Sequence, residues 1–197
     1  MQELQTLLAE LSPWEASAAL LAIGYLLLAA RESHLCWYCA FVSTLIYTAL
    51  FWNVSLLMDS ALNVYYMGMA IYGWRQWRHG GHAHNGIAIS ALPLQRHAMI
   101  LGSIAILTLL SGYLLSRHTV AAWPYVDSFT TWASVVTTIM VAKKILENWL
   151  YWFVIDAVSI PLYIERGLHL TALLFFAYLI IVVAGYTTWR RRYLASG

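Results

Sequence analysis

Seven apolar stretches follow one another along this chain and limit its fold to a membrane-spanning bundle. A helix needs about 20 mainly apolar residues to cross the hydrocarbon core of a bilayer, and its backbone polar groups have to be satisfied within the protein. The stretches show no strand-like alternation. We therefore expect an all-α integral membrane protein in which residues 1–197 form a single transmembrane domain. The predicted helices are 14–31, 35–52, 56–76, 98–116, 124–142, 146–164 and 169–189.

The composition agrees with this class. Hydrophobic residues make up 61% of the chain and charged residues 10%, whereas a soluble domain carries roughly a quarter charged residues. The net charge of +2 is too small to indicate a nucleic-acid partner. The first stretch is preceded by Glu3 and Glu10 rather than by a basic region, so we expect a retained helix and not a cleaved signal peptide.

The distribution of basic residues predicts an orientation. Cytoplasmic loops of membrane proteins carry an excess of Lys and Arg. If the N-terminus lies outside, nine of the eleven basic residues fall in inner loops, and only Arg117 and Arg166 fall in outer ones. We therefore predict an outside N-terminus and a cytoplasmic C-terminus. The inner set is Arg31, Arg75, Arg78, Arg96, Lys143, Lys144, Arg190, Arg191 and Arg192.

The chain also matches itself at an offset of 112 residues. Trp37 falls on Trp149, and "YMGMAIYGWRQWR" (66–78) falls on "YLIIVVAGYTTWR" (178–190), with Tyr, Gly, Trp and Arg coinciding. Convergent membrane composition is the alternative explanation. The offset includes four predicted crossings, an even number, so both copies point the same way. We expect parallel repeats (about 14–78 and 124–190) joined by a linker helix (98–116), a 3+1+3 plan similar to that of the SWEET sugar transporters, with a substrate site at the repeat interface.

The predicted helix 146–164 has one polar and aromatic face at helical spacing. An ionisable group inside a span costs at least about 2.5 kcal/mol, so it usually faces a cavity or a partner. A structural hydrogen bond between helices is the alternative for Asp156, and a favourable position at the helix N-terminus is the alternative for Glu147. An amide beside indoles favours a pocket for a flat polar ring. The face consists of Asn148, Trp152, Ile155, Asp156, Ser159 and Tyr163, with Trp149 adjacent.

Two other predicted helices add candidates. Asp59, Asn63 and Tyr66 share one face of helix 56–76. Trp52 lies at the outer end of helix 35–52, where an interfacial aromatic belt is the preferred explanation. We give the same explanation for two tryptophans at inner helix ends, Trp77 and Trp189.

Two motifs indicate other chemistry less strongly. The stretch "RHGGHAHNG" (78–86) has three histidines but no carboxylate or thiol, so we interpret it as a flexible cytoplasmic loop rather than a metal site. The "CWYC" motif (Cys36–Cys39) has redox spacing, but it lies at the cytoplasmic end of its helix, where thiols stay reduced. We expect ordinary buried cysteines, no catalytic residue, no metal and no cofactor.

The run "KKILENWLYWFVIDAVSIPLYIERGLHLTALLFFAYLIIVVAGYTTWR" (143–190) strongly resembles the bacterial nicotinamide riboside transporters of the PnuC type. Its most specific parts are the Glu-Asn-Trp-x-x-Trp element and the Leu-Tyr-x-x-x-Gly-Leu-x-Leu-Thr-Ala stretch. The seven-helix plan extends the resemblance over nearly the whole chain. The resemblance implies facilitated diffusion of nicotinamide riboside across the bacterial inner membrane, trapping by a cytoplasmic riboside kinase, and a homotrimer.

The candidate residues suit this substrate. Indole and phenol faces attract a pyridinium cation, and the amide of Asn148 can pair with a carboxamide. The spans carry no conspicuous deep basic residue, which argues against a phosphorylated substrate. We therefore predict alternating access within a lipid membrane, around a site for a small-molecule substrate. The predicted substrate-binding residues are Asn148, Trp149, Trp152, Asp156, Asp59, Asn63, Tyr66, Tyr163, Glu147 and Trp52.

Three other functions remain as alternatives. A facilitator for thiamine or a related vitamin or sugar belongs to the same class. A membrane thiol oxidoreductase would use Cys36 and Cys39, and a non-transporting scaffold would bind no small molecule saturably. Replacement of both cysteines by serine would distinguish a transporter from an oxidoreductase, because a transporter should keep its uptake.

Overall fold

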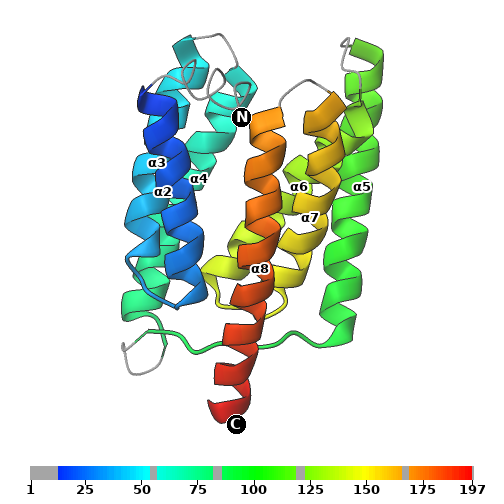
Figure 1. The fold of residues 1–197 in the computed structure, drawn as a ribbon. Helices are drawn as coiled ribbons and strands as arrows, with labels where there is room; N and C mark the ends of the chain where they lie inside the picture. The colour runs from blue at the N-terminus through cyan, green and yellow to red at the C-terminus, as the bar shows by residue number, and fades with distance from the viewer. Residues whose placement is uncertain (1–12, 54–56, 82–85, 119–122, 166–168, 197) are drawn as a thin grey trace.

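The computed structural model describes residues 13–53, 57–81, 86–118, 123–165 and 169–196 (Figure 1). Its regular structure is helical, apart from one isolated bridge between Ser90 and Ile145. Every predicted span is found as a helix, and α8 continues beyond its expected end. The all-α, seven-helix prediction is therefore confirmed for the described residues. The helices are α2 (Pro13–Ala30), α3 (Cys36–Asn53), α4 (Leu57–His79), α5 (Leu94–His118), α6 (Pro124–Ala142), α7 (Asn148–Glu165) and α8 (His169–Ser196).

The helices form two groups of three, with α5 at one edge (Figure 1). In the first group α3 packs against α2 and α4, and in the second α7 packs against α6 and α8. The groups meet where α2 contacts α8 and where α4 contacts α6. Helix α5 packs mainly against α6, and the connection that reaches it from α4 crosses one end of the bundle.

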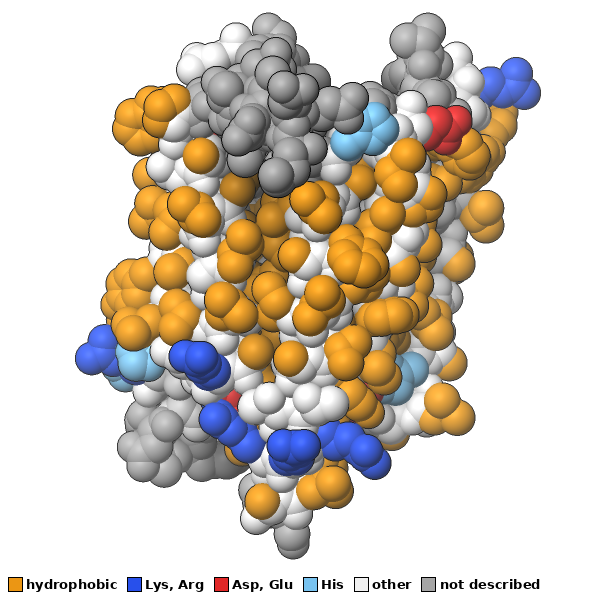
Figure 2. Space-filling view, viewed as in Figure 1, with side chains coloured by type: hydrophobic (Ala, Val, Ile, Leu, Met, Phe, Trp, Pro, Cys, Tyr) orange, Lys and Arg blue, Asp and Glu red, His pale blue; other side chains and the backbone are white. Residues whose placement is uncertain are grey.

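The middle of the bundle has an apolar surface (Figure 2). Three helical segments are long and apolar enough to cross a membrane by length and composition, namely α2, α5 and residues 171–195 of α8. The apolar part of α3 is shorter, Cys36–Leu50. Helices α6 and α7 place polar residues such as Thr138 and Asp156 inside the bundle rather than on its surface.

Lysine and arginine side chains gather at one end of the molecule, which we call the basic end (Figure 2). Helices α2, α4 and α6 end there, and α8 runs out through it to the C-terminus (Figure 1). Arg117 lies in the last turn of α5, at the opposite end.

A cluster of four buried tryptophans lies near the basic end. Trp37 and Trp77 pack edge to face at 5.4 Å between ring centroids, and Trp149 and Trp189 do the same at 5.4 Å. Trp77 lies 5.8 Å from Trp189 and so joins the two pairs. The interfacial-belt prediction for Trp77 and Trp189 is wrong, because both side chains are buried in the core.

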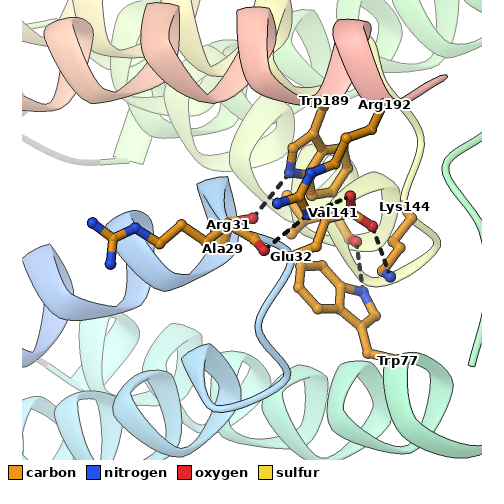
Figure 3. A network of polar contacts seen from close by, with 8 residues as sticks. All are labelled: Ala29, Arg31, Glu32, Trp77, Val141, Lys144, Trp189 and Arg192. Carbon is orange, nitrogen blue, oxygen red and sulfur yellow. Dashed lines mark hydrogen bonds and ion pairs between the residues drawn. The ribbon is translucent and has the colours of Figure 1, made fainter. Parts of the chain in front are cut away.

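Hydrogen bonds tie these indoles to the opposite group of helices (Figure 3). Trp77 Nε1 donates to the carbonyl of Val141 at 3.2 Å, and Trp189 Nε1 donates to the carbonyl of Ala29 at 3.0 Å. Because each bond crosses from one group to the other, the two groups are held together at the basic end.

An ion-pair network covers this cluster (Figure 3). Lys144 Nζ lies 3.0 Å from Glu32 Oε2 and 4.9 Å from the ring centroid of Trp77. Arg192 Nη1 lies 2.9 Å from Glu32 Oε1 and donates to the carbonyl of Arg31 at 3.0 Å. Glu32 and Lys144 have φ values of 57° and 49° in the turns after α2 and α6, a conformation that is uncommon for residues other than glycine. These turns direct the two opposite charges toward each other.

The α4–α5 connection fixes the α6–α7 turn. Ser90 N donates to the carbonyl of Lys144 at 3.0 Å, and Leu146 N donates to the carbonyl of Ser90 at 2.8 Å. Leu92 N donates to the carboxylate of Glu147 at 3.2 Å. The turn that carries Lys144 is therefore held by backbone pairing as well as by its ion pair.

Candidate functional site

A cavity of about 600 Å³ lies between the two groups of helices. Helices α2, α3 and α4 contribute one wall, and α6, α7 and α8 contribute the other. Trp37, a member of the tryptophan cluster, lines the cavity at the basic end. Asp127 and Phe175 line it toward the N-terminal ends of α6 and α8, which lie away from the basic end. The cavity is thus inside the bundle and is bounded by the tryptophan cluster at the basic end.

Helix α7 presents its predicted face to this cavity. Trp152, Asp156, Ser159 and Tyr163 all line it, at positions i, i+4, i+7 and i+11. Helix α4 contributes Tyr66 from the predicted face of helix 56–76. Helical periodicity therefore located these side chains without knowledge of the packing.

Other predicted residues lie outside the lining of the cavity. Asn148 and Trp149 are fully buried at the start of α7, one turn closer to the basic end than Trp152. Glu147 binds Leu92 N and lies 3.9 Å from His97, so it contacts the α4–α5 connection. Asn63 is half-buried on α4.

Two further candidates are at the end of the bundle away from the basic end. Trp52, in the last turn of α3, is 67% exposed. Asp59 belongs to α4, but its side chain lies outside the described residues.

The first turn of α7 holds polar atoms without partners. Asn148 Nδ2 donates to the carbonyl of Ile145 at 2.7 Å, but its Oδ1 accepts no hydrogen bond from the described residues. The indole N–H groups of Trp149 and Trp37 likewise have no acceptor among them. A buried polar group without a hydrogen bond costs about 1–3 kcal/mol, so these atoms lie where a polar ligand or water would be stabilised.

Glycines allow the indoles to pack closely under the cavity. A Cβ atom on Gly73 would overlap the ring of Trp37, and one on Gly185 would overlap the ring of Trp149. The sequence match at 112 residues pairs these two glycines and these two tryptophans. Both contacts therefore require glycine for the same steric reason.

Aromatic and hydroxyl side chains make up most of the remaining lining. Tyr163 packs on Phe175 with ring centroids 4.9 Å apart, and Phe175 packs on Tyr178 at 5.3 Å. Thr44 and Thr138 donate to carbonyls of their own helices at 2.8 Å, which leaves their oxygen lone pairs available to a ligand. Flat faces and hydrogen-bonding hydroxyls suit a ring that carries a sugar.

Sequence reasoning did not single out several lining residues. Tyr178 is the counterpart of Tyr66 at the 112-residue offset, so the internal match could have identified it. Thr130, Ser134 and Thr138 recur at i, i+4 and i+8 along α6, which is the spacing of one helix face. Trp37 is the counterpart of Trp149 at the same offset, so the internal match could have identified it as well. Tyr25 carried no comparable signal, because its neighbours in sequence are also apolar.

The described lining has acidic side chains and no basic ones. Asp127 and Asp156 are the carboxylates among the described lining residues, and no lysine, arginine or histidine is among them. Coulomb interactions are stronger away from bulk water. The cavity therefore favours cationic or neutral ligands over anionic ones.

This chain resembles known transporters in sequence. The family described as nicotinamide mononucleotide transporter matches residues 12–191. The nicotinamide riboside transporter PnuC of Escherichia coli (strain K12) is 25% identical over 197 aligned residues, covering 87% of this chain and 81% of that protein. The riboflavin/roseoflavin transporter RibM of Streptomyces davaonensis is 23% identical over 172 residues, covering 86% of this chain and 78% of that protein.

A solved structure has the same fold. The crystal structure of the vitamin B3 transporter PnuC superposes with a TM-score of 0.70 at 21% sequence identity, covering 89% of this chain and 79% of that one. The likeness supports the helical architecture described above.

Proposed function

This chain belongs to the nicotinamide mononucleotide transporter family, and we propose that within this family it carries nicotinamide riboside by facilitated diffusion across the bacterial inner membrane. The named relatives transport vitamins, so the chain is a vitamin transporter and not an enzyme. Of the alternatives raised by the sequence, the thiol oxidoreductase and the non-transporting scaffold are thereby excluded.

The acidic side chains of the cavity lining are the observation that favours the riboside over the mononucleotide as the substrate. A phosphate group would enter a cavity whose described lining offers two carboxylates and no basic side chain. Nicotinamide riboside instead has a flat pyridinium cation, a carboxamide and a neutral ribose. Tyrosine and tryptophan faces attract such a cation by about 0.5–2 kcal/mol. The hydroxyl groups of the lining suit the ribose.

We assign roles to the predicted residues on this basis. Trp152, Tyr66 and Tyr163 line the cavity and would hold the ring and the ribose, with Asp156 near the positive charge. Asn148 Oδ1 would accept a hydrogen bond from the carboxamide once the ligand reaches the first turn of α7, and Trp149 would flank it. Asp59, Asn63 and Trp52 would act nearer the outer entrance, and Glu147 would hold the turn that carries Lys144.

The proposed mechanism is alternating access by two parallel repeats, α2–α4 and α6–α8, with α5 as the linker. Reciprocal contacts support this proposal. Trp77 bonds to Val141 and Trp189 bonds to Ala29, and each partner lies 112 residues from its counterpart. Glu32 and Lys144 are paired across the same offset. Rocking of the repeats about such a two-fold arrangement would expose the cavity to each side in turn.

We propose that the orientation of the bundle and trapping of the riboside set the direction of net transport. With the N-terminus outside, the basic end faces the cytoplasm, so the tryptophan cluster and the Glu32–Lys144–Arg192 network close the cytoplasmic side. Phosphorylation of the riboside by a cytoplasmic kinase would prevent its return and drive accumulation. The kinase and the homotrimer rest on the family resemblance alone.

Transport by the purified protein tests this proposal. Proteoliposomes are loaded with riboside kinase and ATP, and uptake of labelled nicotinamide riboside is compared with that of riboflavin and thiamine. We expect saturable riboside accumulation that is lost in Trp152→Ala and kept in Trp14→Ala, a matched tryptophan that is exposed and outside the cavity. Uptake of riboflavin or thiamine without riboside would assign a different vitamin, and absence of saturable uptake would refute a carrier.

A further inference from the structure

Asp156 is a carboxylate without a partner inside the membrane domain. It is 4% exposed, lies midway along α7 and lines the cavity. The described residues provide no hydrogen bond or ion pair to its oxygens. By contrast, Glu32 is paired with Lys144 and Arg192, and Glu147 accepts a backbone N–H. A buried ionised carboxylate is strongly disfavoured unless something compensates its charge.

The described residues around Asp156 supply no positive charge. On the facing wall α3 presents Thr44 and α4 presents Tyr66, and on its own wall α6 presents Ser134 and α8 presents Tyr178, all of them neutral hydroxyls. Asp127, the other lining carboxylate, has the same sign as Asp156. The carboxylate is therefore neutralised either by a bound proton or by a cation that occupies the cavity, and only a cation leaves it ionised.

Both carboxyl side chains of the described lining lie on the wall formed by α6, α7 and α8. Thr44 is the counterpart of Asp156 at the 112-residue offset, so the equivalent place on the first group of helices carries a neutral hydroxyl. Trp152, one turn from Asp156 on α7, adds an aromatic face to the same wall. A flat cation can stack on this face and still lie beside the carboxylate.

We propose that Asp156 is the specificity-determining counter-charge that makes this carrier select a cationic ring over a neutral ring of the same shape. The inference rests on the proposed function and narrows its substrate to the oxidised, pyridinium form of the riboside. The reduced riboside has the same carboxamide and ribose but an uncharged dihydropyridine ring. The two forms therefore differ mainly in the charge that Asp156 would recognise.

Calorimetric titration of the purified full-length protein with the two forms tests the inference. Wild type should bind the oxidised riboside at least about tenfold more tightly than the reduced one, a difference of about 1.4 kcal/mol. Asp156→Asn should lose about that factor for the oxidised form, keep its affinity for the reduced form, and bring the ratio near one. Glu165→Gln, which removes an exposed carboxylate of the same helix outside the lining, should keep the preference.

Different outcomes of this titration would refute the role of Asp156 and the proposed riboside transport. If wild type binds both forms equally, or if a folded Asp156→Asn variant keeps the preference, the inference is overturned while riboside transport stands. Equal loss of both forms would give Asp156 a structural role and also overturn it. If wild type binds neither form, the proposed function falls together with the inference. Asp156→Ser, a smaller neutral substitution, provides the same comparison if Asp156→Asn does not fold.

Discussion

Glu32→Gln should open the basic end of the bundle. The substitution keeps the shape of the side chain but removes the negative charge that lies 3.0 Å from the Lys144 ammonium, whose side chain is 10% exposed. Removal of one partner from a buried pair costs about 3–5 kcal/mol. We expect a value near the lower limit, because Lys144 keeps its contact with the ring of Trp77. A loss of about 3 kcal/mol from the closed state raises the open population roughly 100-fold.

A native thiol reports this opening. Cys36 is free and fully buried at the start of α3, directly after the turn that carries Glu32. In a Cys39→Ser background, the rate of Cys36 alkylation by a maleimide should follow the open population when reclosing is fast. We therefore expect Glu32→Gln to accelerate alkylation by roughly two orders of magnitude, as the population shift implies.

A matched variant separates the buried pair from its exposed neighbour. Arg192 bonds the same carboxylate but is 49% exposed, and exposed pairs are worth about 0–1 kcal/mol. Arg192→Gln should therefore accelerate alkylation by no more than about fivefold. The exchange Glu32→Lys with Lys144→Glu, made together with Arg192→Gln so that the new lysine faces no arginine, should restore most of the protection. The reasoning is refuted if Glu32→Gln leaves the rate unchanged, or if Arg192→Gln has the larger effect.

Three further changes give distinct results. Gly185→Ala should lower the free energy of unfolding by about 1–3 kcal/mol, because the added methyl group overlaps the ring of Trp149. Gly102→Ala, whose methyl group meets no atom within 4 Å, should raise the free energy of unfolding by about 0.5–1 kcal/mol. Equal melting temperatures of the two variants in detergent would contradict this reasoning. Trp77→Phe should cost about 0.5–1.5 kcal/mol because it removes the indole hydrogen bond to the Val141 carbonyl, which still accepts the backbone N–H of Lys144. Trp189→Phe should cost a similar amount, because the Ala29 carbonyl still accepts the backbone N–H of Glu32; a larger loss from exposed Trp14→Phe would argue against both expectations. Cys36→Ser with Cys39→Ser should keep riboside uptake in liposomes, and loss of uptake in a folded double variant would reopen a role for the thiols.

Much of the fold follows from local sequence. Apolar stretches of membrane-spanning length specify helices regardless of their partners, so all the spans were located. The face of α7 was also predictable, because periodicity alone decides which side chains of a helix share a side. Periodicity does not give depth along the helix, however. Asn148 lies on the same face as Trp152 but one turn beyond the lining of the cavity.

Contacts between distant segments account for what the sequence did not reveal. Trp77 and Trp189 lie beside arginines at helix ends, which is also typical of interfacial residues. They are buried because α2–α4 and α6–α8 close over them. Glu32 and Lys144 looked like ordinary loop charges, since nothing local indicates that two turns 112 residues apart meet.

The central claim is that an acidic, aromatic cavity between the two groups of helices carries the riboside. Uptake of labelled nicotinamide riboside and of nicotinamide mononucleotide into the same proteoliposomes tests it most directly. Because the described lining offers carboxylates and no basic side chain, we predict saturable riboside uptake that excess mononucleotide does not inhibit. Transport of the mononucleotide at the same rate, or effective inhibition by it, would contradict the account.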